Sequence, residues 1–282
     1  MPKLLFGERN IYTITIIITV TIVIVFLAAW LIFRWVRYKA LLSKPFPPEW
    51  ESIVRKNVQL YNRLPELLKQ QLHGLVHVFL AQKKFEGCGG LQITDEIRVT
   101  IASQACMLLL NRKTSVFKRL HTILVYPNTY IAKTISSDGV VIIEGHSVRL
   151  GESWRHGPVV LAWDSVRGGT ANIGDARNVV LHEFAHQLDQ EDGSSDGTPI
   201  LKNRSSYITW ARILSREYES LQNSEKKGIR SVIDSYGATN PAEFFAVVTE
   251  VFYEKPEMMK KKHPELYREL SNYYNLDPAE WI

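Results

Sequence analysis

The sequence has few cysteines, no strong excess of charge of either sign and no internal repeat. Its two cysteines, Cys88 and Cys106, do not have the spacing of a zinc or redox motif. Two free thiols fit a reducing compartment, although the pair also permits one disulfide. The formal net charge of +5 is modest and comes largely from local clusters, which argues against direct binding to nucleic acid. What remains is an ordinary globular composition, 45% hydrophobic and 22% charged.

Residues 11–33 lack charged side chains altogether. A helix rises about 1.5 Å per residue, so this run is long enough to cross the roughly 30 Å hydrocarbon core of a bilayer. Its length, and the lack of a small-residue cleavage site after it, argue against a cleaved signal peptide. A buried helix of a soluble protein would need a larger protein around it. The sequence therefore predicts a single membrane-spanning helix in contact with the lipid bilayer.

Basic residues are more frequent after this run than before it. Lys3 and Arg9 precede the run, and Arg34, Arg37, Lys39 and Lys44 follow it. Because basic flanks favour the cytoplasmic side, we expect a single-pass protein of the inner (cytoplasmic) membrane whose main domain faces the cytoplasm. The expected divisions are an N-terminal flank at 1–10, a transmembrane helix at 11–33, a basic and Pro-rich linker at 34–48 and the main domain at 49–282.

The main domain is organised around residues 178–189, which contain the pattern His-Glu-x-x-His. Val, Leu, Phe and Ala surround the pattern without Pro or Gly, so the stretch is expected to be helical. Four residues apart on a helix, His182 and His186 project from one face and can bind one zinc ion. Glu183 lies beside them, where a general base for the attacking water is needed. A chance match is the weaker explanation, because an apolar helix rarely carries three titratable groups without partners.

A catalytic zinc ion needs a third protein ligand. Residues 241–253 are expected to form a helix with Asn240 as its cap. Glu243, in the first turn, is assigned as the third ligand, because a carboxylate on an apolar helix is costly unless it is paired or bound to a metal. Glu250 lies on the same face and is assigned as the hydrogen-bond acceptor of a ligand imidazole, with a surface carboxylate as the equal alternative. Asp189 is assigned the same supporting role.

Two further features are expected at the site. Tyr236 would donate a hydrogen bond to the oxyanion formed when a carbonyl is attacked, although a core tyrosine explains it equally well. Residues 159–163 are expected to form a strand, and Gly157-Pro158 before it indicates a sheet edge, because proline cannot donate to a ladder. An edge strand over the metal helix would pair with an extended peptide substrate. The residues predicted to do so are Val159, Val160, Leu161 and Ala162.

The remaining pattern predicts a predominantly helical α+β domain with a small sheet. Helices are expected at 61–84, 94–110, 175–190, 206–222, 241–253 and 264–274, and further strands at 122–126 and 140–144. Residues 85–91 are expected to form a turn. The polar loop 191–197 lacks the ligand spacing of a calcium site and is expected to be a solvent-exposed turn. His73 and His77 lack an acidic partner and are expected to be polar-face or satisfied core residues.

Together these motifs resemble the Mlc titration factor A family of zinc metallopeptidases. The matching stretches are 85–90, 123–127, 151–154, 157–163, 182–189 and 236–252, so the similarity runs from about Trp50 to the C-terminus. The resemblance implies a zincin-like domain related in its core to the anthrax lethal factor protease, with one Zn²⁺ per chain. It implies His182, His186 and Glu243 as ligands, Glu183 as base and Tyr236 as oxyanion donor. It also implies aminopeptidase-like activity and binding to Mlc, a transcriptional repressor. A typical member is soluble, so the membrane anchor departs from the pattern.

The predicted function is a membrane-anchored zinc peptidase acting on a peptide or protein substrate, with a gluzincin-like glutamate as third ligand. The alternative is a zinc domain with little or no catalysis that binds and sequesters a transcriptional regulator. The combination of base, ligands and tyrosine favours the enzyme, because a purely structural zinc site closes all four positions with protein ligands.

Overall fold

The computed structural model describes residues 2–112, 116–128, 132–136, 139–143, 157–171, 174 and 176–281. Three sequence predictions reach outside the described residues: the stretch 151–154, the end of the strand at 140–144 and residue 175 of the helix at 175–190. That helix begins later than predicted, at Val179, because Asn178 is its cap. The chain divides into two compact units, Met1–Lys44 and Pro45–Ile282. The four divisions predicted from the sequence stay predictions.

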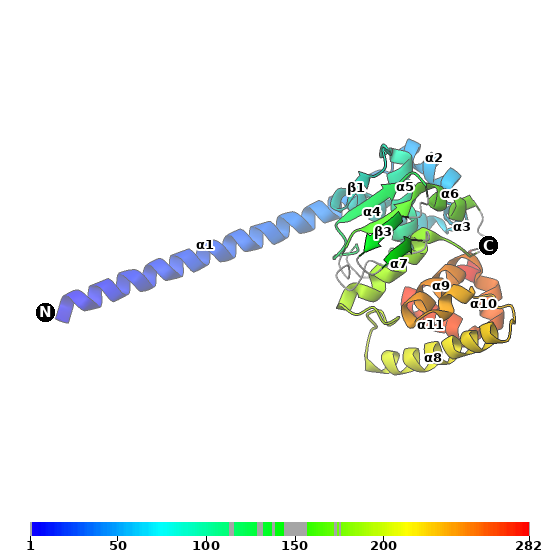
Figure 1. Ribbon diagram of the computed structural model, residues 1–282. Coiled ribbons are helices and arrows are strands. Elements are labelled where there is room, and N and C mark those ends of the chain that lie inside the picture. The colour runs from blue at the N-terminus through cyan, green and yellow to red at the C-terminus, as the bar shows by residue number, and fades with distance from the viewer. Residues whose placement is uncertain are drawn as a thin grey trace. The chain divides into compact units, whose positions relative to one another are not determined.

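The first unit is one long helix, α1 (Pro2–Leu42) (Figure 1). From Ile16 to Leu42 this helix has a mean hydropathy of 3.0, and none of its apolar window is buried. It is the one helix in the described part of the chain that is long and apolar enough to cross a membrane. The helix continues beyond residue 33 because no Pro or Gly interrupts the chain until Pro45.

The second unit is mostly helical, as predicted. Its α-helices are α2 (Pro48–Asn57), α3 (Gln59–Arg63), α4 (Glu66–Gln82), α5 (Asp95–Met107), α6 (Trp163–Ala171), α7 (Val179–Asp189), α8 (Arg204–Lys226), α9 (Pro241–Glu254), α10 (Pro256–Lys262) and α11 (Pro264–Tyr274). Short 3-10 helices are η2 (Gln190–Asp192), η3 (Ser235–Ala238) and η4 (Pro278–Glu280). In Figure 1, α8 to α11 lie together on one side of α7, and the sheet lies on the other.

Prolines divide the helices more finely than the sequence analysis expected. The single helix expected at 61–84 is two helices, α3 and α4, because Pro65 between them has no amide hydrogen for a helical ladder. The unexpected helix α10 begins at Pro256, and the next helix begins at Pro264. Each of these two prolines occupies the first helical position, where its missing donor costs nothing.

The sheet has three parallel strands in the order β1-β2-β5. They are β1 (Lys84–Gly87), β2 (Thr122–Tyr126) and β5 (Val159–Ala162). Among the described strands β5 pairs with β2 alone, so the edge position indicated by Gly157-Pro158 is confirmed. The strands β3 (Ala132–Ser136) and β4 (Gly139–Ile143) form a separate antiparallel hairpin.

The strand β1 corrects the turn predicted at 85–91. Phe85 lies opposite Ile123, and Gly87 lies opposite Val125, in parallel register with β2. The sequence Lys-Phe-Glu-Gly has little strand preference of its own, so pairing with β2 decides its conformation. Only the second half of the predicted turn remains irregular.

An aromatic cluster packs α7, the helix that contains His182 and His186, against α4. Phe184 of α7 packs against Phe79 of α4 and against Phe117, with ring centroids 5.7 and 4.8 Å away. All three rings are at most 1% exposed. Burying a phenylalanine contributes roughly 1.5–3 kcal/mol, so this cluster fixes one side of α7 firmly.

The first residues of the second unit pack against, and hydrogen-bond to, aromatic and histidine side chains. Phe46 stacks on His73 with ring centroids 4.0 Å apart, and the hydroxyl of Tyr61 lies 2.9 Å from His73 Nε2. The Nε2 of His77 lies 3.1 Å from the carbonyl oxygen of Pro45. His73 and His77 therefore bind the chain that enters the domain, in agreement with the prediction that they are satisfied residues.

Candidate metal centre

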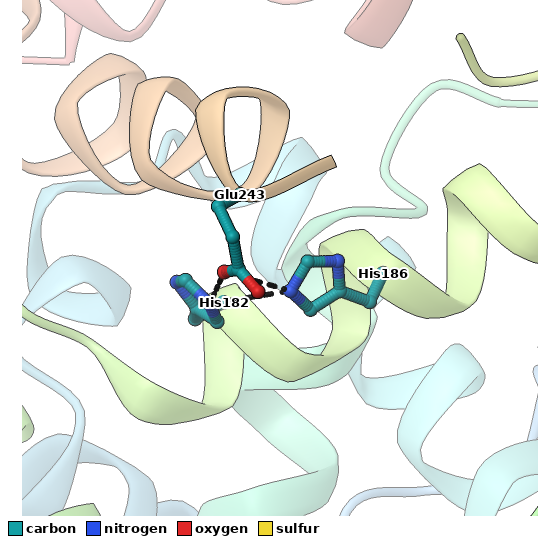
Figure 2. A group of neighbouring side chains, drawn as sticks. All are labelled: His182, His186 and Glu243. Carbon is teal, nitrogen blue, oxygen red and sulfur yellow. Dashed lines mark hydrogen bonds and ion pairs between the residues drawn. The ribbon is translucent and has the colours of Figure 1, made fainter. Parts of the chain in front are cut away.

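Two imidazoles and one carboxylate meet where α7 packs against the first turn of α9. The metal-binding atoms of His182, His186 and Glu243 lie within 4.8 Å of one another, and Figure 2 shows the side chains converging. Glu243 Oε2 lies 3.0 Å from His182 Nε2 and 3.3 Å from His186 Nε2. The two imidazole nitrogens are 3.2 Å apart. No second group of three such ligands occurs in the described part of the chain.

The local sequence explains how α7 presents its two histidines. Asn178 caps the helix, because its side chain accepts a hydrogen bond from the Leu181 amide at 3.1 Å. Val180 and Phe184 are completely buried on another face of the helix. With that face fixed in the core, the face that carries His182 and His186 is turned toward α9.

A second asparagine cap places the carboxylate. The side chain of Asn240 accepts a hydrogen bond from the Glu243 amide at 3.0 Å, and Pro241 is the first residue of α9. The cap therefore puts Glu243 in the first turn, where the positive end of the helix dipole favours a carboxylate.

The three donor atoms fit a tetrahedral metal ion. Atoms bound to zinc at about 2.0–2.1 Å in tetrahedral geometry lie about 3.3–3.4 Å from one another. The three separations in this group, 3.0, 3.2 and 3.3 Å, are close to that value. Two nitrogens and one carboxylate oxygen are also a donor set that catalytic zinc sites use.

Glu250 fixes the orientation of His182. Its Oε1 lies 2.7 Å from His182 Nδ1, and its Oε2 accepts a hydrogen bond from the amide of Asn178. Because Nδ1 faces a carboxylate it carries a proton, so Nε2, which faces Glu243, is the ring nitrogen that would bind a metal. Glu250 is only 5% exposed, so it is not a surface carboxylate.

The surroundings of His182 and Glu243 shift the pKa values of these two side chains in opposite directions. Burial lowers the pKa of His182, but hydrogen bonds to Glu243 and Glu250 outweigh it and raise the pKa to about 10. Burial raises the pKa of Glu243, but hydrogen bonds from the two histidines hold that pKa well below its usual range. The two carboxylates thus favour positive charge at His182, which is the electrostatic environment that a bound cation also requires.

Glu183 and Tyr236 lie beside the ligand group. Glu183 is partly buried; burial raises the pKa of its carboxyl, whereas the neighbouring His182 and His186 lower it. The ring centroid of Tyr236, in η3, is 5.9 Å from that of His182. Tyr236 is partly exposed, unlike a core residue such as Tyr253, which is 1% exposed.

The predicted substrate strand packs against α7. Along β5, Val159 and Leu161 are buried, whereas Val160 and Ala162 are partly exposed. The backbone on the side of β5 away from β2 pairs with no described strand. As far as the described strands go, this side of β5 is left for an extended peptide.

Asn178 is the residue at the site to which the sequence analysis gave no role. Its amide donates to Glu250, and its Nδ2 donates to Glu254 Oε1 at 3.0 Å. An asparagine just before an apolar run is typical of a helix N-cap, so its position alone could have predicted the start of α7. Its bonds to α9 had no sign in the sequence, because the two segments are far apart along the chain.

Comparison with known proteins extends the resemblance over most of the chain. The sequence model of the glucose-regulated metallo-peptidase M90 family matches residues 32–275. An uncharacterized protein of Synechocystis sp. PCC 6803 is 43% identical over 244 residues, which are 86% of this chain and 89% of that protein. Mlc titration factor A of Yersinia pestis is 30% identical over 234 residues, 82% of this chain and 85% of that protein. The resemblance predicted from the motifs is therefore confirmed, and the chain belongs to the glucose-regulated metallo-peptidase M90 family.

Proposed function

We propose that this protein is a membrane-anchored zinc peptidase that hydrolyses peptide bonds with a metal-activated water and a glutamate base. The observation that supports this most directly is the convergence of His182, His186 and Glu243, with Glu183 beside them. Family membership supports a metallopeptidase. The choice of zinc rests on the donor set and on the separations of its atoms. We also propose the zincin-like fold and the gluzincin-like third ligand.

His182, His186 and Glu243 would hold one Zn²⁺ per chain. The bound ion would act as a Lewis acid that makes a water molecule acidic and polarises a carbonyl group. Glu250 keeps the proton on Nδ1 of His182 and so keeps its other nitrogen directed at the ligand group. These residues bind and orient; none of them transfers a proton in the reaction.

Glu183 takes up and releases the proton of the reaction. Its carboxylate accepts a proton from the attacking water while the new C–O bond forms, and it then delivers that proton to the amine as the C–N bond breaks. A carboxyl group whose pKa is raised by burial suits both steps, because it is closer to neutral pH. Tyr236 would donate a hydrogen bond to the oxyanion that exists after the C–O bond has formed and before the C–N bond breaks.

The substrate would be an extended peptide or protein segment. The backbone edge of β5 with which no described strand pairs offers hydrogen-bonding groups beside α7, and Val159, Val160, Leu161 and Ala162 would line the bound segment. We propose aminopeptidase-like cleavage on the strength of the family resemblance.

The long apolar helix α1 would anchor the enzyme in the inner membrane through residues 11–33. Its exposed, apolar surface from Ile16 to Leu42 supports this proposal. The basic residues after the span favour a catalytic domain in the cytoplasm.

The name of several relatives points to a second candidate function, the binding of a regulatory protein. Proteins named Mlc titration factor A are similar over 82% of this chain, so a domain that binds and sequesters a transcriptional regulator is the alternative. Such a domain would need the zinc group and its surroundings, but not Glu183 as a base.

The test uses the full-length protein in detergent micelles. Zinc content and hydrolysis of aminoacyl chromogenic substrates and internally quenched peptides are measured for the wild type and for Glu183→Gln. The exposed Glu219 of α8 provides the matched control, Glu219→Gln. One zinc per chain in all three proteins, with turnover lost only in Glu183→Gln, is the expected result. Zinc without turnover in the wild type would favour the sequestering domain, and a wild type without zinc would refute the proposal.

A further inference from the structure

The ends of the two ligand-bearing helices are joined through one buried glycine. The amide of Gly197 donates a hydrogen bond to Asp189 Oδ2 at 3.0 Å. Asp189 is the last residue of α7, three residues after His186, and it is 0% exposed. The prediction that 191–197 is a solvent-exposed turn is thus wrong at its last residue, because Gly197 is buried. The carboxylate of Asp189 is bound to this loop and not to a ligand imidazole.

Gly197 also lies directly against the start of α9. A Cβ atom at this position would stand 2.3 Å from the carbonyl oxygen of Pro241, and the backbone φ is +78°. Both facts require glycine, since an L side chain would clash and would be strained. Pro241 begins the helix whose first turn carries Glu243.

A third helix holds Gly197 from the other side. Trp210 of α8 is 2% exposed, and its Nε1 donates a hydrogen bond to the carbonyl oxygen of Gly197 at 3.1 Å. The Trp210 ring packs against Phe245 of α9, with centroids 5.7 Å apart. The amide and the carbonyl of Gly197 are therefore both bonded to buried side chains.

We propose that Asp189 is a positioning residue of the metal centre, which acts through Gly197 to hold the first turn of α9 against the end of α7. This inference rests on the proposed function in taking His182, His186 and Glu243 as the ligands. The chain of contacts runs from the helix with two ligands, through one amide, to the helix with the third. Neither of the two hydrogen bonds of Gly197 involves a ligand atom.

The required precision explains why this contact matters for metal binding. Ligand distances in a metal site must be correct within about 0.2 Å. If Gly197 carried a methyl group, relief of the contact with Pro241 would need a shift of about 1 Å toward ordinary van der Waals separation. Glu243 lies two residues beyond Pro241, so part of this shift would reach the carboxylate.

The experiment measures the Zn²⁺ affinity of the full-length protein in detergent by competition with a chromogenic chelator. Asp189→Ala and Gly197→Ala should weaken the affinity about 10- to 100-fold, as loss of supporting contacts does in other metal sites. Asp189→Asn keeps an acceptor for the Gly197 amide and should stay within about threefold of the wild type. The matched control is Asp192→Ala, an exposed residue of the same loop, which should leave the affinity unchanged.

The thermal midpoint of the metal-free protein separates positioning from general stability. Leu270→Ala removes a fully buried side chain of α11 and should lower the midpoint without changing the affinity. Asp189→Ala with a lowered midpoint and wild-type affinity would overturn the inference, and so would failure of Asp189→Asn to restore affinity. A wild type that binds no zinc would overturn this inference and the proposed function together, whereas normal wild-type binding with unaffected variants would overturn this inference alone.

Discussion

The substitution Glu250→Gln should weaken metal binding and stability together. The Glu250 carboxylate accepts two hydrogen bonds, from His182 Nδ1 at 2.7 Å and from the Asn178 amide at 2.5 Å. A glutamine has one acceptor oxygen, so one of the two donors would face an NH₂ group instead. A hydrogen bond to a charged group contributes about 1.5–3 kcal/mol, and we expect a loss of about 2–3 kcal/mol in the free energy of unfolding. For a domain of this size that is about 5–10 °C in thermal midpoint.

The metal affinity should fall for a separate reason. In Glu250→Gln the charged acceptor that keeps the proton on Nδ1 of His182 is lost, so both ring nitrogens compete for that proton. Substitution of such partners weakens metal binding about 10- to 100-fold. Chelator competition and thermal unfolding of the metal-free protein measure the two effects independently.

Glu254→Gln is the matched control. Glu254 lies one turn further along α9, is 5% exposed and accepts a hydrogen bond from the Asn178 side chain, which a glutamine oxygen can still accept. Its substitution should cost less stability and leave the zinc affinity within about twofold. Equal loss of affinity in both variants would refute the assignment of Glu250 as the partner of His182.

Two further predictions concern the pH dependence of stability at Lys83 and the effect of Tyr236 on turnover. Burial lowers the pKa of Lys83 from 10.5 to about 8. The unfolded chain then holds more protons between these pH values, so the free energy of unfolding should rise by about 2–3 kcal/mol from pH 8 to pH 10 and change little below pH 8. Denaturant unfolding of the wild type and Lys83→Met checks this: the stability difference between them should grow with pH, and a constant difference would contradict it. Tyr236→Phe should lower turnover about 10- to 1000-fold with unchanged zinc affinity, if its hydroxyl stabilises the oxyanion. Steady-state kinetics with a quenched peptide measures this, and wild-type turnover would show that the tyrosine is structural.

The sequence predicted the two helices that carry the candidate ligands because their determinants are local. His182 and His186 are one helical turn apart, and Asn240 stands as a cap before an apolar run, so both helices could be located from spacing and residue type. The cap Asn178 was placed inside the helix expected at 175–190, whereas α7 begins after it, at Val179. The pairing of His182 with Glu243 was inferred from the chemical need for a third ligand. Its geometry came only from the structure, since 61 residues separate the two.

The elements that the sequence analysis missed depend on distant partners. The strand β1 exists because β2 supplies the pairing that Lys-Phe-Glu-Gly does not favour alone. Gly197 stands among Asp, Ser and Gly residues that are typical of exposed loops, and it is buried because Pro241 and Trp210 pack against it. The break at Pro65, in contrast, has a local cause, because proline has no amide hydrogen with which to continue a helix.

The packed start of the second unit bears on how the domain could be cut from its helix. α1 ends at Leu42, and Pro45 and Phe46 are already held by His77 and His73. Ser43 and Lys44 are the two residues between the end of α1 and Pro45, so a protease that separates the whole helix from the domain would have to cut there. A trypsin-like enzyme would select Lys44, but the bond that follows joins it to proline, which such enzymes cleave poorly. A domain released from α1 by a protease should therefore carry the tail of α1 with it. A recombinant fragment that begins at Glu49 would lack Phe46, whose ring stacks on His73.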